Sequence, residues 1–214
     1  MKNTEAGLLT IYGDLNSGNC YKIELLLQRL DRQYRWRRID ILAGEARTPG
    51  FLQKNPNGKV PILELADGRI LCESNAILCY LASGTSLLPE TPFARASVMQ
   101  WLFFEQHRHE PTIAEARFIV KFLGEADARK AQLAEKHEAG YRALDVMEKT
   151  LATRDFMAGD HYTIADIALY AYSHVADEGG FDLSGYPAIG RWFDRVVAQP
   201  GYLSLAEARV RHGH

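Results

Sequence analysis

The sequence predicts a two-domain protein, in which a small α/β domain is followed by a larger domain made only of helices. Three observations support this class. Roughly the first 82 residues alternate strand and helix patterns, residues 83–92 are rich in Gly, Ser, Thr and Pro, and no convincing strand follows them. A chain of 214 residues is long enough to bury a core in each part.

The first domain opens with a buried strand, residues 8–12 (LLTIY), and an amphipathic helix over residues 20–30. Apolar residues at the i, i+3, i+4, i+7 spacing of one helix face predict that helix: Ile23, Leu26, Leu27 and Leu30. Residues 34–41 (YRWRRIDI) alternate as a strand does, and residues 48–56 (TPGFLQKNP) form a short helix or turn. Because a helix joins the first two strands, we expect them to be parallel.

A hairpin and a helix complete this domain. Residues 59–65 (KVPILEL) and 69–72 (RILC) form two short strands, and Asp67-Gly68 between them is a strong signal for an antiparallel hairpin. A helix follows from Ser74, with three apolar residues on one face: Ile77, Leu78 and Leu81. The predicted element order is therefore β-α-β-α-β-β-α.

After residue 92 every element is predicted to be helical. A long helix runs from Phe93 to near Lys121. Pro111 should kink or interrupt it, because proline lacks an N–H group and clashes with the preceding turn. Residues 125–151, which are rich in Ala, Glu, Lys and Leu, form a second long helix.

Two further helices carry clear boundary signals. One begins at Thr163, where Thr163-x-x-Asp166 is a capping box, which we interpret as a stability element without a catalytic role. The other lies within residues 186–202 (YPAIGRWFDRVVAQPGY) and is ended by Pro200-Gly201.

Composition and charge exclude several classes of partner. The net charge of −2 argues against a nucleic-acid or membrane partner. No stretch approaches the ~18 apolar residues of a membrane span, and residues 1–7 (MKNTEAG) lack the apolar core of a secretory signal. The cysteines form no CxxC pair, so we expect free thiols in the cytoplasm: Cys20, Cys72 and Cys79. The histidines show no ligand spacing, so no metal site is expected.

The corner between the first strand and the first helix, residues 14–27 (DLNSGNCYKIELLL), raises the first question of function. Ser17 stands where a helix cap is expected, and serine is a favoured cap. The same position would also present its hydroxyl to a ligand at the helix N-terminus. Both interpretations are open from these residues alone.

Pro61 stands at the head of a strand, where its missing N–H is normally unfavourable. A proline in this place often marks a cis peptide bond. The backbone N–H and C=O of Val60 would then pair with an extended, peptide-like ligand. An edge-strand proline without any ligand is the alternative.

Glu73 and Ser74 stand at a junction between a strand and a helix. The free N–H groups of the helix start and the Ser74 hydroxyl make an anion site suited to a carboxylate. Glu73 would accept hydrogen bonds from a ligand ammonium group, so the pair would hold both charges of an amino-acid zwitterion. A plain helix cap is the alternative.

These motifs, in this order, resemble the cytosolic glutathione S-transferase superfamily, in particular its serine-type, bacterial-like members. Five segments spread over nearly the whole chain carry the resemblance: SGNCYKIELLL, NPNGKVPIL, ESNAILCYLA, GDHYTIADIALY and YPAIGRWFDRVVAQPGY. It implies a thioredoxin-like N-terminal domain (βαβαββα) and an all-α C-terminal helical bundle. The expected boundaries are 1–82 for the glutathione-binding domain, 83–92 for the linker and 93–214 for the helical domain.

The resemblance implies that glutathione lies along the N-terminal domain as a co-substrate, with no metal. Val60, before Pro61, would pair with the cysteinyl backbone of glutathione. Glu73 and Ser74 would hold its γ-glutamyl end.

The glycyl carboxylate has less well-defined partners. Lys59 lies beside the proline loop and is the expected contact, with Arg47 as the weaker candidate. Ala46 stands where some relatives have a histidine, which is a departure from the family pattern.

Ser17 matches the catalytic serine of the family, whereas Tyr12 lies one place from the hydroxyl of the tyrosine-type classes. An unperturbed thiol has a pKa of about 8.5, so a hydroxyl donating to sulfur at a helix N-terminus would stabilise the reactive thiolate. Redox proteins of the thioredoxin-like fold carry CxxC at this corner, and Ser17 and Cys20 take the places of its two cysteines. We therefore expect the protein to borrow the sulfur of glutathione, and Cys20 to be a small buried residue.

The resemblance also implies a second-substrate pocket walled by the first long helix. Its candidate residues are Trp101, Phe104, Glu105 and Arg108. The expected protein is a cytoplasmic, homodimeric glutathione transferase that acts on a small electrophile in detoxification. The alternatives are a glutathione-dependent peroxidase, disulfide reductase or isomerase on the same fold, or a non-catalytic glutathione-binding protein.

Overall fold

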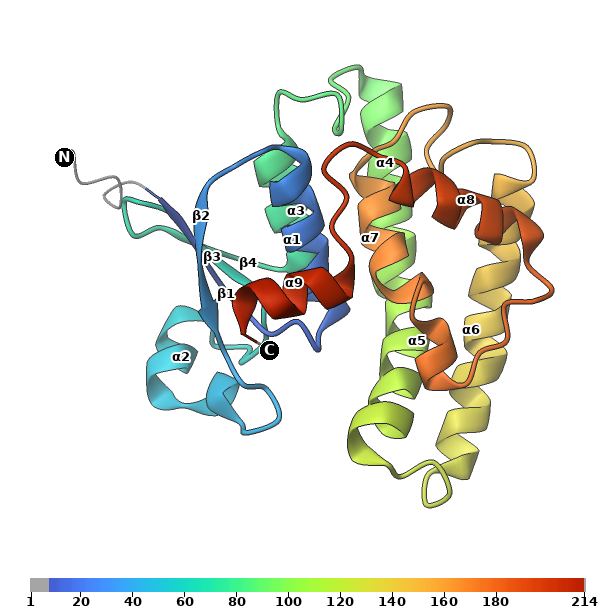
Figure 1. Ribbon diagram of the computed structural model, residues 1–214, viewed down its shortest axis with the longest axis horizontal. Helices are drawn as coiled ribbons and strands as arrows, with labels where there is room; N and C mark the ends of the chain where they lie inside the picture. Colours follow the sequence, from blue (N-terminus) through green and yellow to red (C-terminus); the bar gives the residue numbers. More distant parts are fainter. Residues whose placement is uncertain (1–7, 214) are drawn as a thin grey trace. The chain divides into compact units, whose positions relative to one another are not determined.

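The computed structural model describes residues 8–213, which divide into two compact units (Figure 1). The first unit contains residues 8–83 and 200–213, and the helical unit contains residues 84–199. The predicted succession of an α/β part and an all-helical part is confirmed. Residues 1–7, where the sequence shows no signal-peptide pattern, and residue 214 lie outside the described residues.

The first unit is built on a four-stranded mixed sheet with the strand order β2-β1-β3-β4. Its strands are β1 (Leu9–Gly13), β2 (Tyr34–Arg38), β3 (Ile62–Glu64) and β4 (Ile70–Cys72). Its helices are α1 (Gly18–Arg29), α2 (Pro49–Lys54), α3 (Ser74–Ala82) and α9 (Leu205–His212), with a short 3-10 turn, η1 (Glu45–Arg47). β1 is parallel to β2, and β3 and β4 are antiparallel, so the predicted crossover and hairpin are confirmed.

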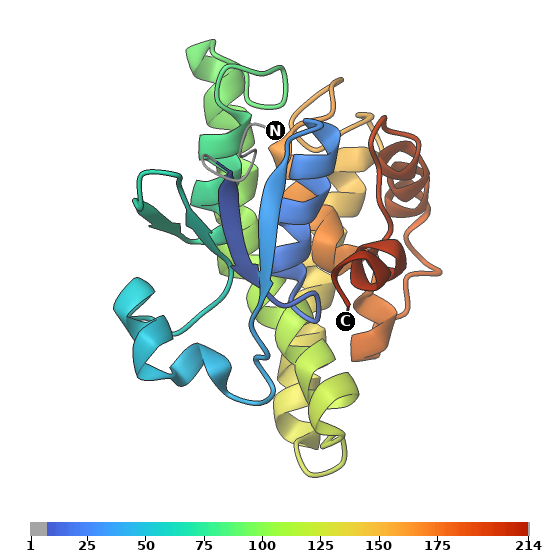
Figure 2. The ribbon, with the colours of Figure 1, turned by 60° about the vertical axis from the view of Figure 1, so that its left-hand side comes forward.

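The two faces of the sheet carry different helices. Tyr12 and Ile62 are paired across β1 and β3, and they pack with Phe51 of α2. Ile11 and Leu63, the next residues along these strands, are fully buried and point to the opposite face because side chains alternate along a strand. α1 and α3 cover that face (Figures 1 and 2). Burying each such side chain contributes ~1.5–3 kcal/mol.

The helical unit follows the linker. Its elements are α4 (Pro92–Phe104), the π-helical turn η2 (Glu105–His109), α5 (Glu110–Arg117), the π-helical turn η3 (Phe118–Leu123), α6 (Lys130–Leu151), α7 (Ile164–Ser173), the 3-10 turn η4 (Ala176–Gly179) and α8 (Pro187–Val197). Pro111 is the second residue of α5, and η2 directly precedes that helix, so the predicted interruption is confirmed. Over residues 8–213, no helix is long and apolar enough to cross a membrane.

The predicted capping box at the start of α7 is confirmed. The Thr163 side chain accepts a hydrogen bond from the Ala165 N–H, and the Asp166 carboxylate accepts one from the Thr163 N–H at 2.9 Å. Asp166 also accepts hydrogen bonds from the Met157 N–H at 2.8 Å and the Trp192 indole N–H at 3.0 Å. Burial raises the pKa of Asp166 to about 6, and these hydrogen bonds oppose the rise.

The C-terminal helix α9 was not predicted from the sequence. Its position also alters the boundary between the two units. The expected helical domain extended to residue 214, whereas residues 200–213 pack with the first unit. Ser204 and Glu207 form a second capping box at the start of α9, and this S-x-x-E pattern was the available sequence signal.

Candidate active site

Ser17 ends a tight turn and begins α1 without capping it. The Ser17 N–H donates to the Asp14 carbonyl at 2.9 Å, which closes the turn. The Ser17 carbonyl accepts from the Cys20 and Tyr21 N–H groups at 3.1 and 3.2 Å, which starts the helix. The Ser17 side chain, however, makes no capping hydrogen bond. The sequence left a plain cap open, and the geometry does not support it.

The neighbouring thiol of Cys20 is not available as a nucleophile. Cys20 is fully buried, and its sulfur accepts the Asp14 N–H at 3.4 Å. Burial raises the pKa of Cys20 to about 12, and the hydrogen bonds with the Asp14 N–H and the Ser17 side chain only partly oppose this rise. The prediction that Cys20 is a small buried residue is confirmed.

The Val60-Pro61 peptide bond is cis, as the sequence predicted. Within residues 8–213, the backbone N–H and C=O of Val60 make no hydrogen bond to another residue. Asn55 supports the segment before them, because its side-chain amide donates to the Lys59 carbonyl at 2.8 Å. An extended ligand can therefore pair with Val60 as an added strand would.

Two basic residues flank this loop. Arg47 donates to the Asn57 carbonyl at 3.3 Å, and its side chain packs so closely on Gly58 that a Cβ there would lie 2.7 Å from the Arg47 Nη1. Gly58 has a φ of +62°, which also favours glycine. Lys59 is exposed. Both side chains stand beside the proline loop, where the glycyl carboxylate was expected.

Glu73 adopts a sterically disfavoured backbone conformation at the start of α3. Its φ of 69° and ψ of 115° lie outside the regions that non-glycine residues normally occupy. Such a conformation costs ~1–3 kcal/mol and is typical of ligand sites. The Glu73 side chain is exposed and does not cap the helix, so its carboxylate faces solvent.

A buried lysine brings the N-termini of α1 and α3 together. The Lys22 side chain is fully buried, and its ammonium group lies 2.7 Å from the Asn19 Oδ1, 3.3 Å from the Ser74 Oγ and 3.4 Å from the Asn75 Oδ1. Ser74 in turn donates to the Asn19 Oδ1 at 2.9 Å. A cation beside two helix N-termini makes the Ser74 side of the site favourable for a carboxylate.

Sequence reasoning missed Lys22. The only signal was a lysine inside an otherwise apolar helix start, and three of its partners are amide and hydroxyl oxygens from both helices.

Tyr12 is engaged on the opposite face of the sheet. Its hydroxyl donates to the Glu64 carboxylate at 2.7 Å, and the Lys54 ammonium group binds the same carboxylate at 2.7 Å. Burial, together with the hydrogen bond to Glu64, raises the pKa of Tyr12. A tyrosine in these contacts is a poor donor to a ligand sulfur, so Ser17 is the better candidate.

Comparisons with known proteins agree with these features. Two family models match the chain: the glutathione S-transferase N-terminal domain over residues 8–83 and the glutathione S-transferase C-terminal domain over residues 109–200. The Escherichia coli disulfide-bond oxidoreductase YfcG is 32% identical over 190 residues, which are 85% of this chain and 87% of that protein. The chain belongs to the glutathione S-transferase superfamily.

Solved structures of this superfamily show the same fold. A glutathione S-transferase from Pseudomonas fluorescens Pf-5 is 55% identical, with a TM-score of 0.91 over 92% of this chain and 98% of that chain. A second protein from the same organism, described as a glutathione transferase family member with two glutathione bound, is 28% identical. Its TM-score is 0.83 over 94% of this chain and 92% of that chain. The thioredoxin-like N-terminal domain and the helical C-terminal domain are thereby confirmed.

The second-substrate residues expected from the glutathione S-transferase resemblance differ in exposure. Trp101 and Glu105 are buried, with 6% and 0% of their surface exposed. Phe104 is half-buried and packs edge-to-face on Trp101 with a centroid distance of 5.2 Å, and Arg108 is exposed. Phe104 and Arg108 thus keep surface that a ligand can contact, and the pocket itself stays a prediction. Among residues 8–213, no cluster of three or more His, Cys, Asp or Glu residues is arranged to hold a metal ion.

Proposed function

We propose that the protein is a glutathione transferase, in which the Ser17 hydroxyl holds the sulfur of bound glutathione as a thiolate. The observation that carries the proposal is the contrast between the Ser17 hydroxyl and the Cys20 thiol at the turn between β1 and α1. Ser17 begins a helix without capping it, whereas the thiol beside it is buried and has a pKa of about 12. The corner thus offers a hydroxyl and a helix N-terminus to a sulfur that the ligand must bring.

The energy required is within reach of these two groups. Lowering a thiol pKa by ~2 units takes ~2.7 kcal/mol, at about 1.36 kcal/mol per unit. A hydrogen bond to a charged acceptor supplies ~1.5–3 kcal/mol, and a helix N-terminus adds ~0.3–1 kcal/mol. No general base with an unusual pKa is needed.

The rest of the site fits the ends of glutathione. The backbone of Val60 is free to pair with the cysteinyl unit. The γ-glutamyl carboxylate would bind at Ser74, where the buried Lys22 ammonium lies 3.3 Å from the hydroxyl, and its ammonium group would bind Glu73. Lys59, with Arg47 beside it, would bind the glycyl carboxylate. The P. fluorescens relative with two glutathione bound supports this choice of ligand.

The reaction is a nucleophilic displacement on a small electrophile. The glutathione thiol releases its proton to solvent, and the thiolate attacks an electrophilic carbon of the acceptor. A sulfur–carbon bond forms while the bond to the leaving group breaks, and the leaving group departs with the electron pair.

Titration of the ultraviolet absorbance of the thiolate, in the complex of the full chain with glutathione, tests the role of Ser17. Ser17→Ala should raise the pKa of the bound thiol by about 1–2 units, because one charge-assisted hydrogen bond is lost. An unchanged titration would overturn the assignment. Cys20→Ala is the matched control and should keep the wild-type titration, because Cys20 is not the source of the thiolate.

Disulfide reduction is a second candidate, favoured by the similarity to the E. coli disulfide-bond oxidoreductase. The same thiolate would attack a mixed disulfide of glutathione, form glutathione disulfide and release the other thiolate. Parallel assays with an aryl halide, a hydroperoxide and a mixed disulfide distinguish the two activities. If only the aryl halide is turned over, the proposed transferase activity is supported. If only the mixed disulfide is turned over, the transferase proposal is wrong and disulfide reduction takes its place.

We also infer that the protein is a cytoplasmic homodimer active in detoxification. Phe93 and Phe103 of α4 are 85% and 61% exposed, so α4 offers apolar surface that a partner subunit could cover. Light scattering should give twice the 24.1 kDa mass of one chain. A mass equal to one chain would contradict the dimer.

A further inference from the structure

The C-terminal helix α9 contacts the turn that leads into Ser17. Arg209 of α9 donates from its Nη2 to the Leu15 carbonyl at 3.4 Å and to the Asn16 Oδ1 at 3.2 Å. Leu15 and Asn16 are the two central residues of the turn that the Ser17 N–H closes on the Asp14 carbonyl. Arg209, almost two hundred residues away in the sequence, therefore hydrogen-bonds to the two residues immediately before Ser17.

We propose that Arg209 is a positioning residue, which restrains the Asp14–Ser17 turn and so fixes the direction of the Ser17 hydroxyl. This inference rests on the proposed function of Ser17. Arg209 would touch neither glutathione nor the reacting atoms, and it would act through Leu15 and Asn16.

The turn is held from its other side by Asp14. This carboxylate is fully buried and accepts hydrogen bonds from the Asn16 N–H at 2.8 Å and the Ile41 N–H at 3.1 Å. Asp14 thus holds the backbone N–H of Asn16, while Arg209 holds the Leu15 carbonyl and the Asn16 side-chain oxygen. Without Arg209, the hydrogen bond from the Ser17 N–H to the Asp14 carbonyl would remain, but Leu15 and Asn16 would lose a restraint on their orientation.

Arg209 is an effective restraint only if α9 itself is fixed, and the segment before α9 is well anchored. The fully buried Tyr21 of α1 donates from its hydroxyl to the Leu203 carbonyl at 2.7 Å. Gly201 has a φ of +75°, and a Cβ there would lie 2.8 Å from the Gln28 carbonyl oxygen at the end of α1. The chain therefore passes against α1 at a distance that only glycine permits.

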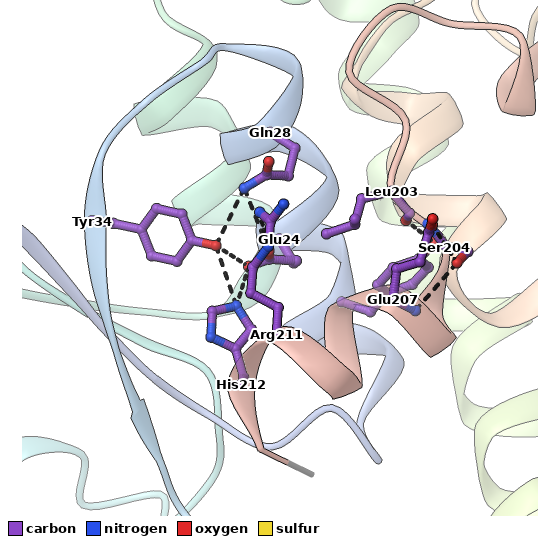
Figure 3. A network of polar contacts seen from close by, with 9 residues as sticks. Glu24, Gln28, Tyr34, Leu203, Ser204, Glu207, Arg211 and His212 are labelled. Carbon is purple, nitrogen blue, oxygen red and sulfur yellow. Dashed lines mark hydrogen bonds and ion pairs between the residues drawn. The ribbon is translucent and has the colours of Figure 1, made fainter.

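The far end of α9 is anchored by a buried carboxylate. Figure 3 shows Tyr34, Gln28, Arg211 and His212 converging on Glu24 of α1. Glu24 is fully buried, so these partners offset the large cost of placing a charge away from water. The His212 Nε2 lies 3.2 Å from the Glu24 carboxylate, and its ring stacks on Trp36 at a centroid distance of 4.6 Å.

Arg209 lies between these two anchors and is half-buried. The helix that carries it is therefore held by contacts at both ends. Small displacements of an oriented group cost much rate, since ~1 Å of misplacement can cost ~100-fold.

Arg209→Gln in the full chain removes the charge and keeps part of the stem. We expect the amides of Ser17, Cys20 and Tyr21, which lie in or next to the turn, to exchange hydrogen faster. We also expect kcat to fall by on the order of 10-fold while the KM for glutathione changes by less than about 2-fold, because geometry is lost and binding is not. Arg209→Lys should recover part of both effects, since it restores a charged donor.

Arg211→Gln is the matched control. It makes the same charge change on the same helix, but Arg211 lies 3.7 Å from Glu24 and not against the turn, and Gln28, Tyr34 and His212 still hold Glu24 when Arg211 is lost, so α9 stays anchored. Equal effects of the two Gln variants on corner exchange and kcat would overturn the proposal, because Arg209 would then act only through the stability of α9. If wild-type protein shows no bound thiolate, the proposed function fails, whereas the exchange data still decide whether Arg209 restrains the corner.

Discussion

Two of the helices that begin at a residue with a side-chain hydroxyl, α1 and α7, differ in the partner of that hydroxyl. At the start of α7, Thr163 is 3% exposed, and its side chain accepts from the helix backbone while Asp166 returns a hydrogen bond to the Thr163 N–H. At the start of α1, Ser17 is half-buried, and its side chain makes no capping hydrogen bond. The helix backbone uses the Thr163 hydroxyl, whereas it does not use the Ser17 hydroxyl, which instead faces the Cys20 sulfur.

The difference follows from the third residue of each helix. Asp166 completes a reciprocal box that locks Thr163 in the capping rotamer. Cys20, at the matching place in α1, has no carboxylate to return, and its buried sulfur accepts the Asp14 N–H instead. An incomplete box leaves a hydroxyl unused by the helix backbone, as it also does at Thr48 and Thr91, so the case for Ser17 depends on its place in the site as well.

The largest expected effect is at the α7 box. Asp166→Ala should lower the free energy of unfolding by about 3–4 kcal/mol, since it strands the buried N–H groups of Met157, Thr163 and Trp192. Urea unfolding measures this loss. Asp182→Ala is the control, because the exposed Asp182 also accepts a backbone N–H, from Ser184 at 2.8 Å, and its loss should cost far less. Similar losses in both variants would contradict the assigned importance of the box.

Replacing the two hydroxyls makes the comparison directly. Thr163→Ala should cost ~1–2 kcal/mol of stability, the usual cost of a lost N-cap, whereas Ser17→Ala should cost less than ~0.5 kcal/mol. Urea unfolding of both variants is the measurement, and the bound-thiol titration should move only in Ser17→Ala. If Ser17→Ala destabilises as much as Thr163→Ala, then Ser17 is a structural cap and the contrast is lost.

Elements with strong local signals could be predicted from the sequence. The Asp67-Gly68 hairpin, the crossover from β1 to β2 and the α7 box each depend on residues close together in the chain. α9 was missed because it has only 8 residues and follows Pro200-Gly201, a pair that reads as the end of a helix. Its place against α1 depends on contacts between residues almost two hundred positions apart.

The candidate site divides in the same way. The cis bond before Pro61 was predicted from short motifs, and the unusual backbone of Glu73 lies at a junction that such a motif marked. Lys22 and Arg209 were not predicted, because their importance comes from oxygens on other elements. No local sequence pattern predicts the partners of Lys22, which lies in an apolar helix, or of Arg209, which lies in a charged C-terminal segment.

The other completed capping box, at Ser204, should give the smallest effect and sharpen the contrast. Its side chain accepts the Glu207 N–H at 3.2 Å, and the Glu207 carboxylate accepts the Ser204 N–H at 3.0 Å, so the box resembles that of α7 but is more exposed. Ser204→Ala should speed amide exchange in the first turn of α9 by about 2–3-fold, because an exposed cap protects only its own turn.

The same variant should leave the titration of bound glutathione unchanged, because the anchors at Tyr21 and Glu24 keep Arg209 in place. A rise in the thiol pKa as large as that in Ser17→Ala would show that this cap controls the corner from a distance. The distinction between hydroxyls that cap a helix and the proposed catalytic hydroxyl of Ser17 would then fail. An unchanged titration with faster local exchange would place Ser204 beside Thr163, as a hydroxyl used by the backbone, and would separate both from Ser17, which makes no capping hydrogen bond.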